Sequence, residues 1–362
     1  MKRTTLALAS ALALVSSSGA VALAGDGHGN GPVKPDDRSS KTIDLAVIGD
    51  IPYGPAMIAK FPSRIDQINA DPKVDMVLHL GDIKSGSSRC DTSYFEAIRA
   101  QFDRFQDPLA YTPGDNEWTD CHRESNGSYQ PAGPLVPSPL VKGAGPSRLD
   151  EVRRIFFPEP GRTLGQRSRA VETQGSPIVE NVRWSDARTQ FGLIHVVGSD
   201  DDGLPWFGEN ETPALRAVRV EEKRVRSAAA VAWLGRIFEE ADRRDNQAVV
   251  IGIQADMFDP EIRLKRALHE AFEPFVRALA AHARAFDGPV LLLNGDSHVY
   301  EADRPLADPA AINNKIYGID EPVANLQRIT VNGSSNATDY LRLHVDRKDP
   351  KAFAFERVAF TP

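Results

Sequence analysis

Four aspartates follow glycine at the ends of short apolar runs, and this pattern suggests a shared metal site. Each run is typical of a buried strand in a parallel sheet, and the carboxyl ends of such strands meet at the edge where open α/β folds bind ligands. The glycine lets the chain turn sharply beside an ion. We therefore expect the four carboxylates to converge. The pairs are Gly49-Asp50, Gly81-Asp82, Gly114-Asp115 and Gly295-Asp296.

The order and spacing of these pairs resemble the calcineurin-like metallophosphoesterases. That family's pattern runs Asp-x-His, Gly-Asp, Gly-Asn-His-Glu/Asp, a histidine after a strand, and Gly-His-x-His. The resemblance implies an α/β fold, a four-layer α-β-β-α sandwich with mixed β-sheets, whereas the alternation of strands and helices alone supports only α/β. The matching segments are Asp50-Ile51-Pro52, Gly81-Asp82, Gly114-Asp115-Asn116-Glu117, Gln254 and Gly295-Asp296-Ser297-His298.

The resemblance further implies hydrolysis of phosphate mono- or diesters at a dinuclear metal site. Two divalent ions about 3.5–4 Å apart activate water and neutralise phosphoryl oxygens in such sites. Carried over position by position, the ligands are Asp82, bridging both ions; Asp50 and His298, at the first ion; and Asp115, Gln254 and Asp296, at the second.

Several of these positions depart from the family pattern. Pro52 stands where the family has a histidine and cannot ligate, while Gln254 and Asp296 replace two other histidines. Carboxylate and amide oxygens favour Mn²⁺, Mg²⁺ or Ca²⁺ over Zn²⁺. Tyr53 either supplies a phenolate oxygen in place of the lost ligand or belongs to an ordinary loop.

The group that assists departure of the leaving group is also altered. Asn116 stands where the family has a histidine, and an amide cannot act as a general acid. We expect Asn116 to hydrogen-bond a phosphoryl oxygen and Glu117 to orient it. His122 either replaces the missing acid or is a plain loop histidine. Hydrolysis is therefore expected to be slow, or restricted to good leaving groups.

These departures leave two functions open. The first is a metal-dependent hydrolase of small phosphate esters. The second is a catalytically impaired pseudo-phosphoesterase that acts as an extracellular binding module. Retention of aspartate at every strand end favours the enzyme, because carboxylates crowded together without metal repel one another.

The amino terminus predicts export. Residues 1–24 combine a basic start, an apolar segment and an Ala-x-Ala cleavage site, as secretory signals do. Residues 25–41 are expected to be a disordered leader and residues 42–362 the phosphoesterase domain. The mature protein would then be secreted or periplasmic, with no membrane span. The formal net charge of −7 argues against a nucleic-acid partner.

Two cysteines and two loops complete the predictions. Cys90 and Cys121 follow two of the aspartates closely, so a disulfide between them would clamp the loops that leave the site. The proline-rich segment 122–147 is either functional or disordered. The acidic turn 198–203 is interpreted as solvated, with a loop at the rim of the site as the alternative.

Overall fold

Two β-sheets pack face to face in the structure, a computed structural model that describes residues 36–37, 41–127, 144–259, 266–349 and 352–361. All of these residues belong to one unit, Val33–Pro362. The smaller sheet has five strands, of which β2, β3 and β4 run parallel and carry the first three Gly-Asp pairs at their carboxyl ends. Its order is β13 (Phe353–Ala359), β12 (Asp339–Asp346), β2 (Thr42–Ile48), β3 (Met76–His79) and β4 (Leu109–Tyr111).

The larger sheet has eight strands and is also mixed. Its parallel centre consists of β7, β8, β9 and β11. The two middle strands, β8 and β9, are almost entirely apolar because they are covered on both faces. The order is β1 (Asp36–Asp37), β6 (Val182–Asp186), β7 (Thr189–Leu193), β8 (Ala248–Gly252), β9 (Val290–Asn294), β11 (Leu326–Thr330) and β10 (Glu301–Asp303), with β5 (Glu172–Thr173) paired to β6.

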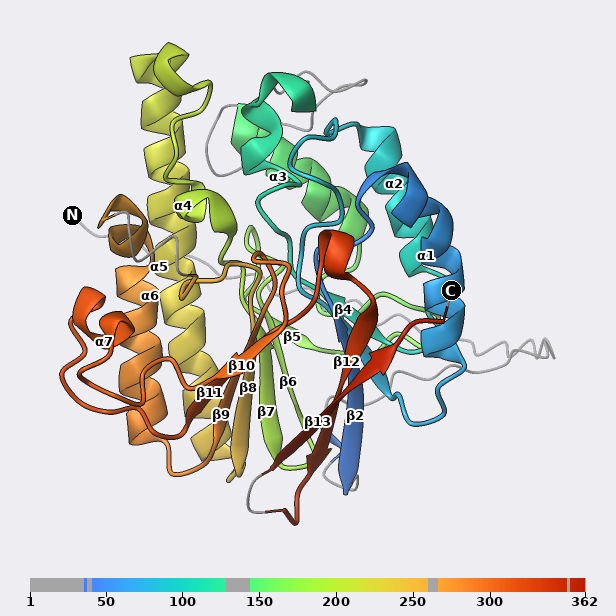
Figure 1. Cartoon of the computed structure of the whole chain (residues 1–362), viewed down its shortest axis with the longest axis vertical. Coiled ribbons are helices and arrows are strands. Elements are labelled where there is room, and N and C mark those ends of the chain that lie inside the picture. Colours follow the sequence, from blue (N-terminus) through green and yellow to red (C-terminus); the bar gives the residue numbers. More distant parts are fainter. Residues whose placement is uncertain (1–35, 38–40, 128–143, 260–265, 350–351, 362) are drawn as a thin grey trace, which may run out of the picture. The chain divides into compact units, whose positions relative to one another are not determined.

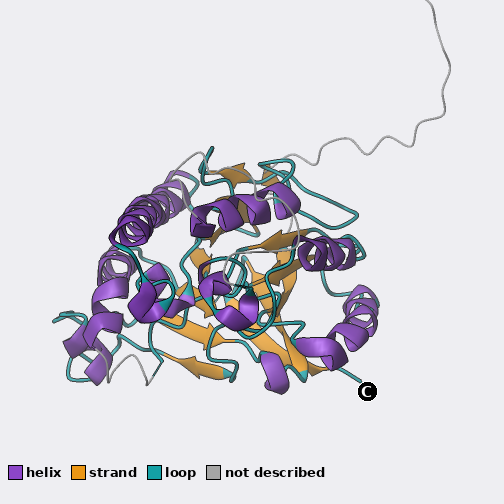
Figure 2. Ribbon diagram, turned by 90° about the horizontal axis from the view of Figure 1, so that it is seen from above, coloured by secondary structure: helices purple, strands orange, loops and turns teal. Residues whose placement is uncertain are grey.

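Helices cover the outer face of each sheet, so the fold has four layers (Figures 1 and 2). Between the sheets lies a core of aliphatic residues that includes Val47 and Leu78 from one sheet and Leu193 and Leu293 from the other. The predicted α-β-β-α sandwich is thereby confirmed. The smaller sheet is covered by α1 (Gly54–Asn69), α2 (Thr92–Phe102) and α3 (Ala144–Phe156), and the larger one by α5 (Pro213–Arg243), α6 (Arg266–Ala285) and α7 (Ile312–Ile316).

Two helices on the smaller sheet begin without a side-chain cap. Helix α1 begins at Gly54 with Pro55 in its first turn, where a missing N–H costs little, and Pro62 lies inside it. Asp91 directly precedes α2, but its carboxylate binds Arg89 and makes no capping bond to the helix.

The amino-terminal predictions fall almost wholly outside the described residues. Residues 1–35 and 38–40 are among those not described, and the expected signal peptide therefore stays a prediction. Asp36 and Asp37, within the expected leader, form the short strand β1 beside β6. Of the helices in the described segments, none combines the length and apolar character needed to cross a membrane.

Candidate active site

Five predicted site residues follow the ends of parallel strands from both sheets and meet at one edge of the sandwich. Asp50, Asp82 and Asp115 come from the smaller sheet, and Gln254 and Asp296 from the larger one. The first four are buried, with Asp115 the most accessible at 6% exposure. Their convergence follows from the topology, since parallel strands deliver their carboxyl ends to the same edge.

The backbone turns sharply at three of the carboxylates. Asp50, Asp82 and Asp296 have φ values of 53°, 56° and 72°, in the left-handed region that L-residues rarely adopt. Each such residue costs roughly 1–2 kcal/mol, which the surrounding packing must offset. Other described residues, such as Ala187 and Asp245, share this conformation, but at these three positions it sets the direction of a site carboxylate.

Three carboxylates form a compact cluster that fits a divalent cation. One oxygen each from Asp82, Asp115 and Asp296 lie within 4.8 Å of one another. Hard cations take oxygen ligands at about 2.0–2.6 Å, which suits this spacing. Burial, followed by the charge of Asp115, holds the pKa values of the Asp82 and Asp296 carboxyls well above their usual range. A cation would relieve this repulsion, so the donor set fits at least one hard metal ion.

Asp82 has the most hydrogen-bond donors around it. Its Oδ2 accepts from the Tyr53 hydroxyl at 3.0 Å and from Asn116 Nδ2 at 2.8 Å, and its Oδ1 accepts from the Asn116 backbone at 3.1 Å. Burial and the charge of Asp82 hold the pKa of Tyr53 well above its usual range. The Tyr53 hydroxyl thus serves as a hydrogen-bond donor to Asp82 in the structure, whereas the sequence alone leaves a phenolate ligand open.

Asp50 and His298 lie together beside this cluster. His298 Nε2 is 3.5 Å from Asp50 Oδ1, and both Asp50 oxygens are 3.1 Å from the backbone nitrogen of Asp296. Burial lowers the pKa of His298, but the Asp50 carboxylate outweighs it and the net shift is upward. The structure thus brings together the two residues that the resemblance assigns to the first ion.

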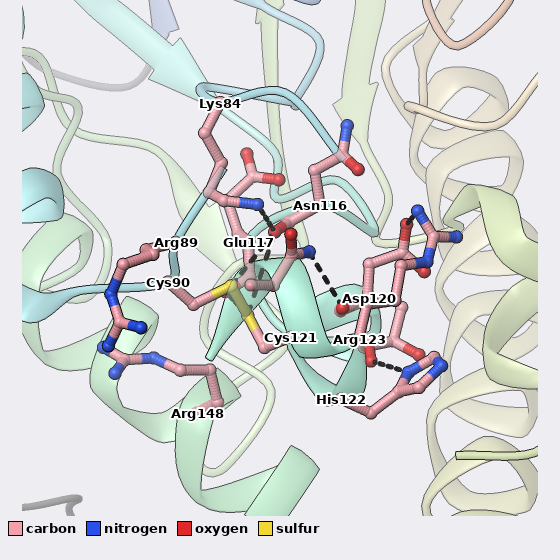
Figure 3. The surroundings of a disulfide bond; sticks show 12 residues. Lys84, Arg89, Cys90, Asn116, Glu117, Asp120, Cys121, His122, Arg123 and Arg148 are labelled. Carbon is pink, nitrogen blue, oxygen red and sulfur yellow. Dashed lines mark hydrogen bonds and ion pairs between the residues drawn. A yellow bond between two sulfur atoms is a disulfide. The ribbon is translucent and has the colours of Figure 1, made fainter. Parts of the chain in front are cut away.

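A disulfide between Cys90 and Cys121 fixes the loop that carries Asn116, and the spacing of the two cysteines predicted this bridge (Figure 3). Buried Lys84 reinforces it by donating to the Asn116 carbonyl at 2.9 Å, and burial lowers the pKa of this amine to about 8. The bridge joins the segment after β3 to the segment after β4, and so holds Asn116 close to Asp82.

The residues next to Asn116 have other partners than expected. Glu117 is fully buried and accepts from the Ile83 backbone and the Tyr111 hydroxyl, both at 2.9 Å. Its carboxylate therefore anchors the strand ends, and no described bond joins it to the Asn116 side chain. The His122 ring bonds the Thr119 carbonyl and is directed away from Asn116 (Figure 3).

Three functional candidates were not recognised from the sequence. Ser199 Oγ lies 2.7 Å from both Asp115 Oδ2 and Asp120 Oδ1 and can donate its one hydrogen to either. Arg123 pairs with Asp120 at 2.6 Å. Arg123 stays 40% exposed at the edge of the site. The only sequence signal was the position of Asp120 and Arg123 shortly after Asp115, a spacing too common in loops to be informative.

Ser199 reaches the site because the acidic turn α4 (Gly198–Asp202) curls inward. Ser199, Asp200 and Asp201 have φ values of 49°, 63° and 53°. Asp201 is 3% exposed and binds buried Arg226, and Asp202 is completely buried. The interpretation of this turn as solvated is therefore wrong, because Arg226 of α5 pairs with Asp201 while Thr119 and Trp206 donate to Asp202.

Behind Asp296 lies a second buried ion pair. Asp256 donates its backbone N–H to Asp296 at 3.1 Å, and its carboxylate binds Arg328 at 2.6 Å. Arg328 also binds Asp303 on β10. This pair fixes the loop after β8 against β11, and so helps position the carboxylate cluster.

The sequence profile of the calcineurin-like phosphoesterases matches residues 43–221, a stretch that contains the first three Gly-Asp pairs. This match, on a sandwich of the predicted kind, identifies the chain as a member of that family. The family typically binds divalent metals and hydrolyses phosphate esters. The resemblance inferred from the sequence is thereby confirmed.

Solved structures give weaker similarities. No curated protein matches the sequence significantly. This chain spans about half the length of two nucleotidases that it resembles. GAP50, the anchor in the inner membrane complex of Plasmodium, is 8% identical, with 89% of this chain and 90% of that chain covered and a TM-score of 0.41. Haemophilus influenzae NAD nucleotidase is 11% identical, with 88% of this chain and 55% of that chain covered and a TM-score of 0.39. A 5′-nucleotidase precursor from Thermus thermophilus is 13% identical, with 89% of this chain and 55% of that chain covered and a TM-score of 0.40.

Proposed function

We propose that this chain is an exported, metal-dependent hydrolase of small phosphate mono- or diesters. The observation that carries the proposal is the convergence of Asp82, Asp115 and Asp296, from three strand ends in two sheets, on one compact cluster of oxygens. Export rests on the signal-like residues 1–24 and would place the mature protein outside the cell or in the periplasm. The oxygen donors favour Mn²⁺, Mg²⁺ or Ca²⁺ over Zn²⁺.

A divalent ion, when bound, lowers the pKa of water and offsets charge on the phosphoryl oxygens. The chain's own contribution is to position the phosphate. The Asn116 carboxamide lies beside Asp82, and Arg123 presents an exposed guanidinium held by Asp120 and by the Gly86 carbonyl. A planar guanidinium suits phosphate oxygens, to which it can donate two parallel hydrogen bonds.

Gly86 keeps Asn116 and Arg123 close together. A Cβ atom at this position would lie 2.7 Å from Asn116 Oδ1 and 2.9 Å from Arg123 Nη1. The carboxamide and the guanidinium therefore flank the same short stretch of backbone. The carboxamide turns its oxygen to this side, because Asn116 Nδ2 donates to Asp82 and Tyr53. Arg123 is therefore the group here that can donate to a phosphate. This arrangement supports a phosphate-ester substrate over a neutral one.

Protonation of the leaving group is the step for which this site is least equipped. Asn116 has no proton to transfer, and the His122 ring is directed elsewhere. We therefore expect turnover of aryl phosphates, whose leaving groups depart without an acid, to exceed that of alkyl phosphates. The corresponding experiment measures phosphate release from both ester classes by metal-stripped protein supplied with Mn²⁺, Mg²⁺, Ca²⁺ or Zn²⁺ in turn. No release with any metal would reject the proposal.

The second candidate is the impaired pseudo-phosphoesterase that serves as an extracellular binding module. The observation in its favour is that Asp82, the expected bridging ligand, already accepts bonds from Tyr53 and Asn116. This alternative predicts binding of inorganic phosphate without hydrolysis of any ester. Calorimetry with phosphate, beside the assay above, separates the two functions.

A further inference from the structure

Gln254 lies against the carboxylate cluster with its amide in a defined orientation. Its side chain is completely buried, and its Oε1 accepts the backbone N–H of Gly198 at 2.6 Å. The amide nitrogen is left facing the carboxylates. Its distances are 3.2 Å to Asp82 Oδ2, 3.1 Å to Asp115 Oδ1 and 3.2 Å to Asp296 Oδ1. Gln254 thus presents a hydrogen-bond donor where a metal ligand would present oxygen.

This orientation is costly to reverse. A half-turn of the amide would place its NH₂ group against the Gly198 N–H and its oxygen against three carboxylates. Each buried polar group left without a partner costs about 1–3 kcal/mol. The side chain also has little room to move, because a Cβ atom at Gly81 would come within 2.8 Å of Gln254 Cγ.

The Gln254 amide partly replaces the stabilisation that a cation would give to the three carboxylates. Crowded, buried carboxylates need compensating positive charge or hydrogen-bond donors. The three that Gln254 contacts are those that the family resemblance assigns to the second ion, with Asp82 bridging. At the other position Pro52 supplies no side-chain ligand.

From this geometry we infer that Gln254 stands in for the second of the two metal ions, the one beside Asp115 and Asp296. One cation is left to Asp82 and the first-ion residues Asp50 and His298. Its amide donates to the carboxylates and is not a ligand, and the site holds one divalent cation per chain. The inference rests on the proposed metal-dependent function and deepens it, since it changes the expected dinuclear site to a mononuclear one.

The test counts the ions. Metal-stripped wild-type protein is titrated with Mn²⁺ by calorimetry, and the metal retained after desalting is measured by elemental analysis. One ion per chain is expected, with the electron paramagnetic resonance spectrum of an isolated Mn²⁺. Two ions with an exchange-coupled spectrum would overturn this inference while leaving the proposed function intact. Absence of binding together with absence of ester hydrolysis would overturn both.

Two variants test the role of the amide. Q254M keeps the volume but offers neither donor nor oxygen, so the folded variant should still bind one Mn²⁺ with equal or higher affinity. Loss of the ion in folded Q254M would mean that Gln254 is a ligand after all. Q190M removes another fully buried amide, one that bonds within the β6–β7 hairpin, and controls for the general effect of such a loss. If Q254M fails to fold, the wild-type ion count still decides.

Discussion

Asn116 hydrogen-bonds Asp82 with both its backbone and its side chain, at 3.1 Å to Oδ1 and 2.8 Å to Oδ2. The residue that replaces the family's histidine therefore orients the central carboxylate, and its side-chain nitrogen is also bonded to the Tyr53 hydroxyl. Loss of its side chain in N116A should cost about 1–3 kcal/mol in kcat/KM, as expected for hydrogen bonds, because the backbone bond remains.

The reverse substitution, N116H, restores an imidazole at this position. An added general acid should raise kcat most for alkyl phosphates and least for aryl phosphates, whose leaving groups need no proton. Comparison of kcat for the two ester classes in wild type, N116A and N116H checks this. An equal change for both classes would show that the imidazole does not act on the leaving group.

Arg123 is expected to bind the substrate phosphate. R123A should weaken competitive inhibition by inorganic phosphate by about 1.5–3 kcal/mol, or roughly 10- to 150-fold, because a bond to a charged group is lost. The matched control is R89A, which removes a half-exposed arginine that pairs with Asp91 on the other side of the disulfide (Figure 3). Similar inhibition constants in R123A and R89A would argue against a role for Arg123.

His79 should make the protein less stable in acid. Its Nε2 donates to the Ile51 carbonyl at 2.9 Å, its Nδ1 has no partner among the described residues, and burial lowers its pKa to about 4. The unfolded chain takes up this proton near pH 6.5 and the folded chain only near 4, so stability falls as the pH drops through that window.

H79Q keeps a donor for Ile51 but does not titrate. The stability lost on this substitution should therefore shrink by about 2–3 kcal/mol between pH 7.5 and 4.5. Urea unfolding at the two pH values measures the difference. A stability difference between wild type and H79Q that does not change with pH would show that folding does not lower the pKa of His79.

The disulfide should contribute strongly to stability. It joins cysteines separated by 31 residues, for which chain entropy predicts about 3–4 kcal/mol. The double variant C90A/C121A should unfold at a correspondingly lower urea concentration. Reducing agent should lower the wild-type midpoint and leave that of the double variant unchanged. Equal midpoints for oxidised wild type and the double variant would contradict this contribution.

Much of the site was predictable because its main signal is local. Apolar runs that end in Gly-Asp show where strands stop. Parallel topology then brings Asp50 and Asp82 to one edge of the smaller sheet, and face-to-face packing of the larger sheet adds Asp296. The disulfide followed by the same reasoning, since loops that leave neighbouring strand ends are neighbours themselves.

The remainder depends on contacts that sequence order does not reveal. The orientation of the Gln254 amide is set by the backbone of Gly198, which is 56 positions away. The inward curl of the acidic turn depends on Arg226 and on non-glycine residues with positive φ, which composition cannot predict.

The most direct test of the account compares D82N with wild type and with D75N under one metal condition. Asp82 is buried at the centre of the cluster, whereas Asp75 lies at the opposite end of β3, where it accepts the Asp44 backbone N–H. With Mn²⁺ and an aryl phosphate, wild type and D75N should hydrolyse the ester. D82N, stripped of the central charge, should lose both Mn²⁺ binding and turnover. Equal rates for all three proteins would contradict the central claim that this carboxylate cluster is a metal-dependent active site.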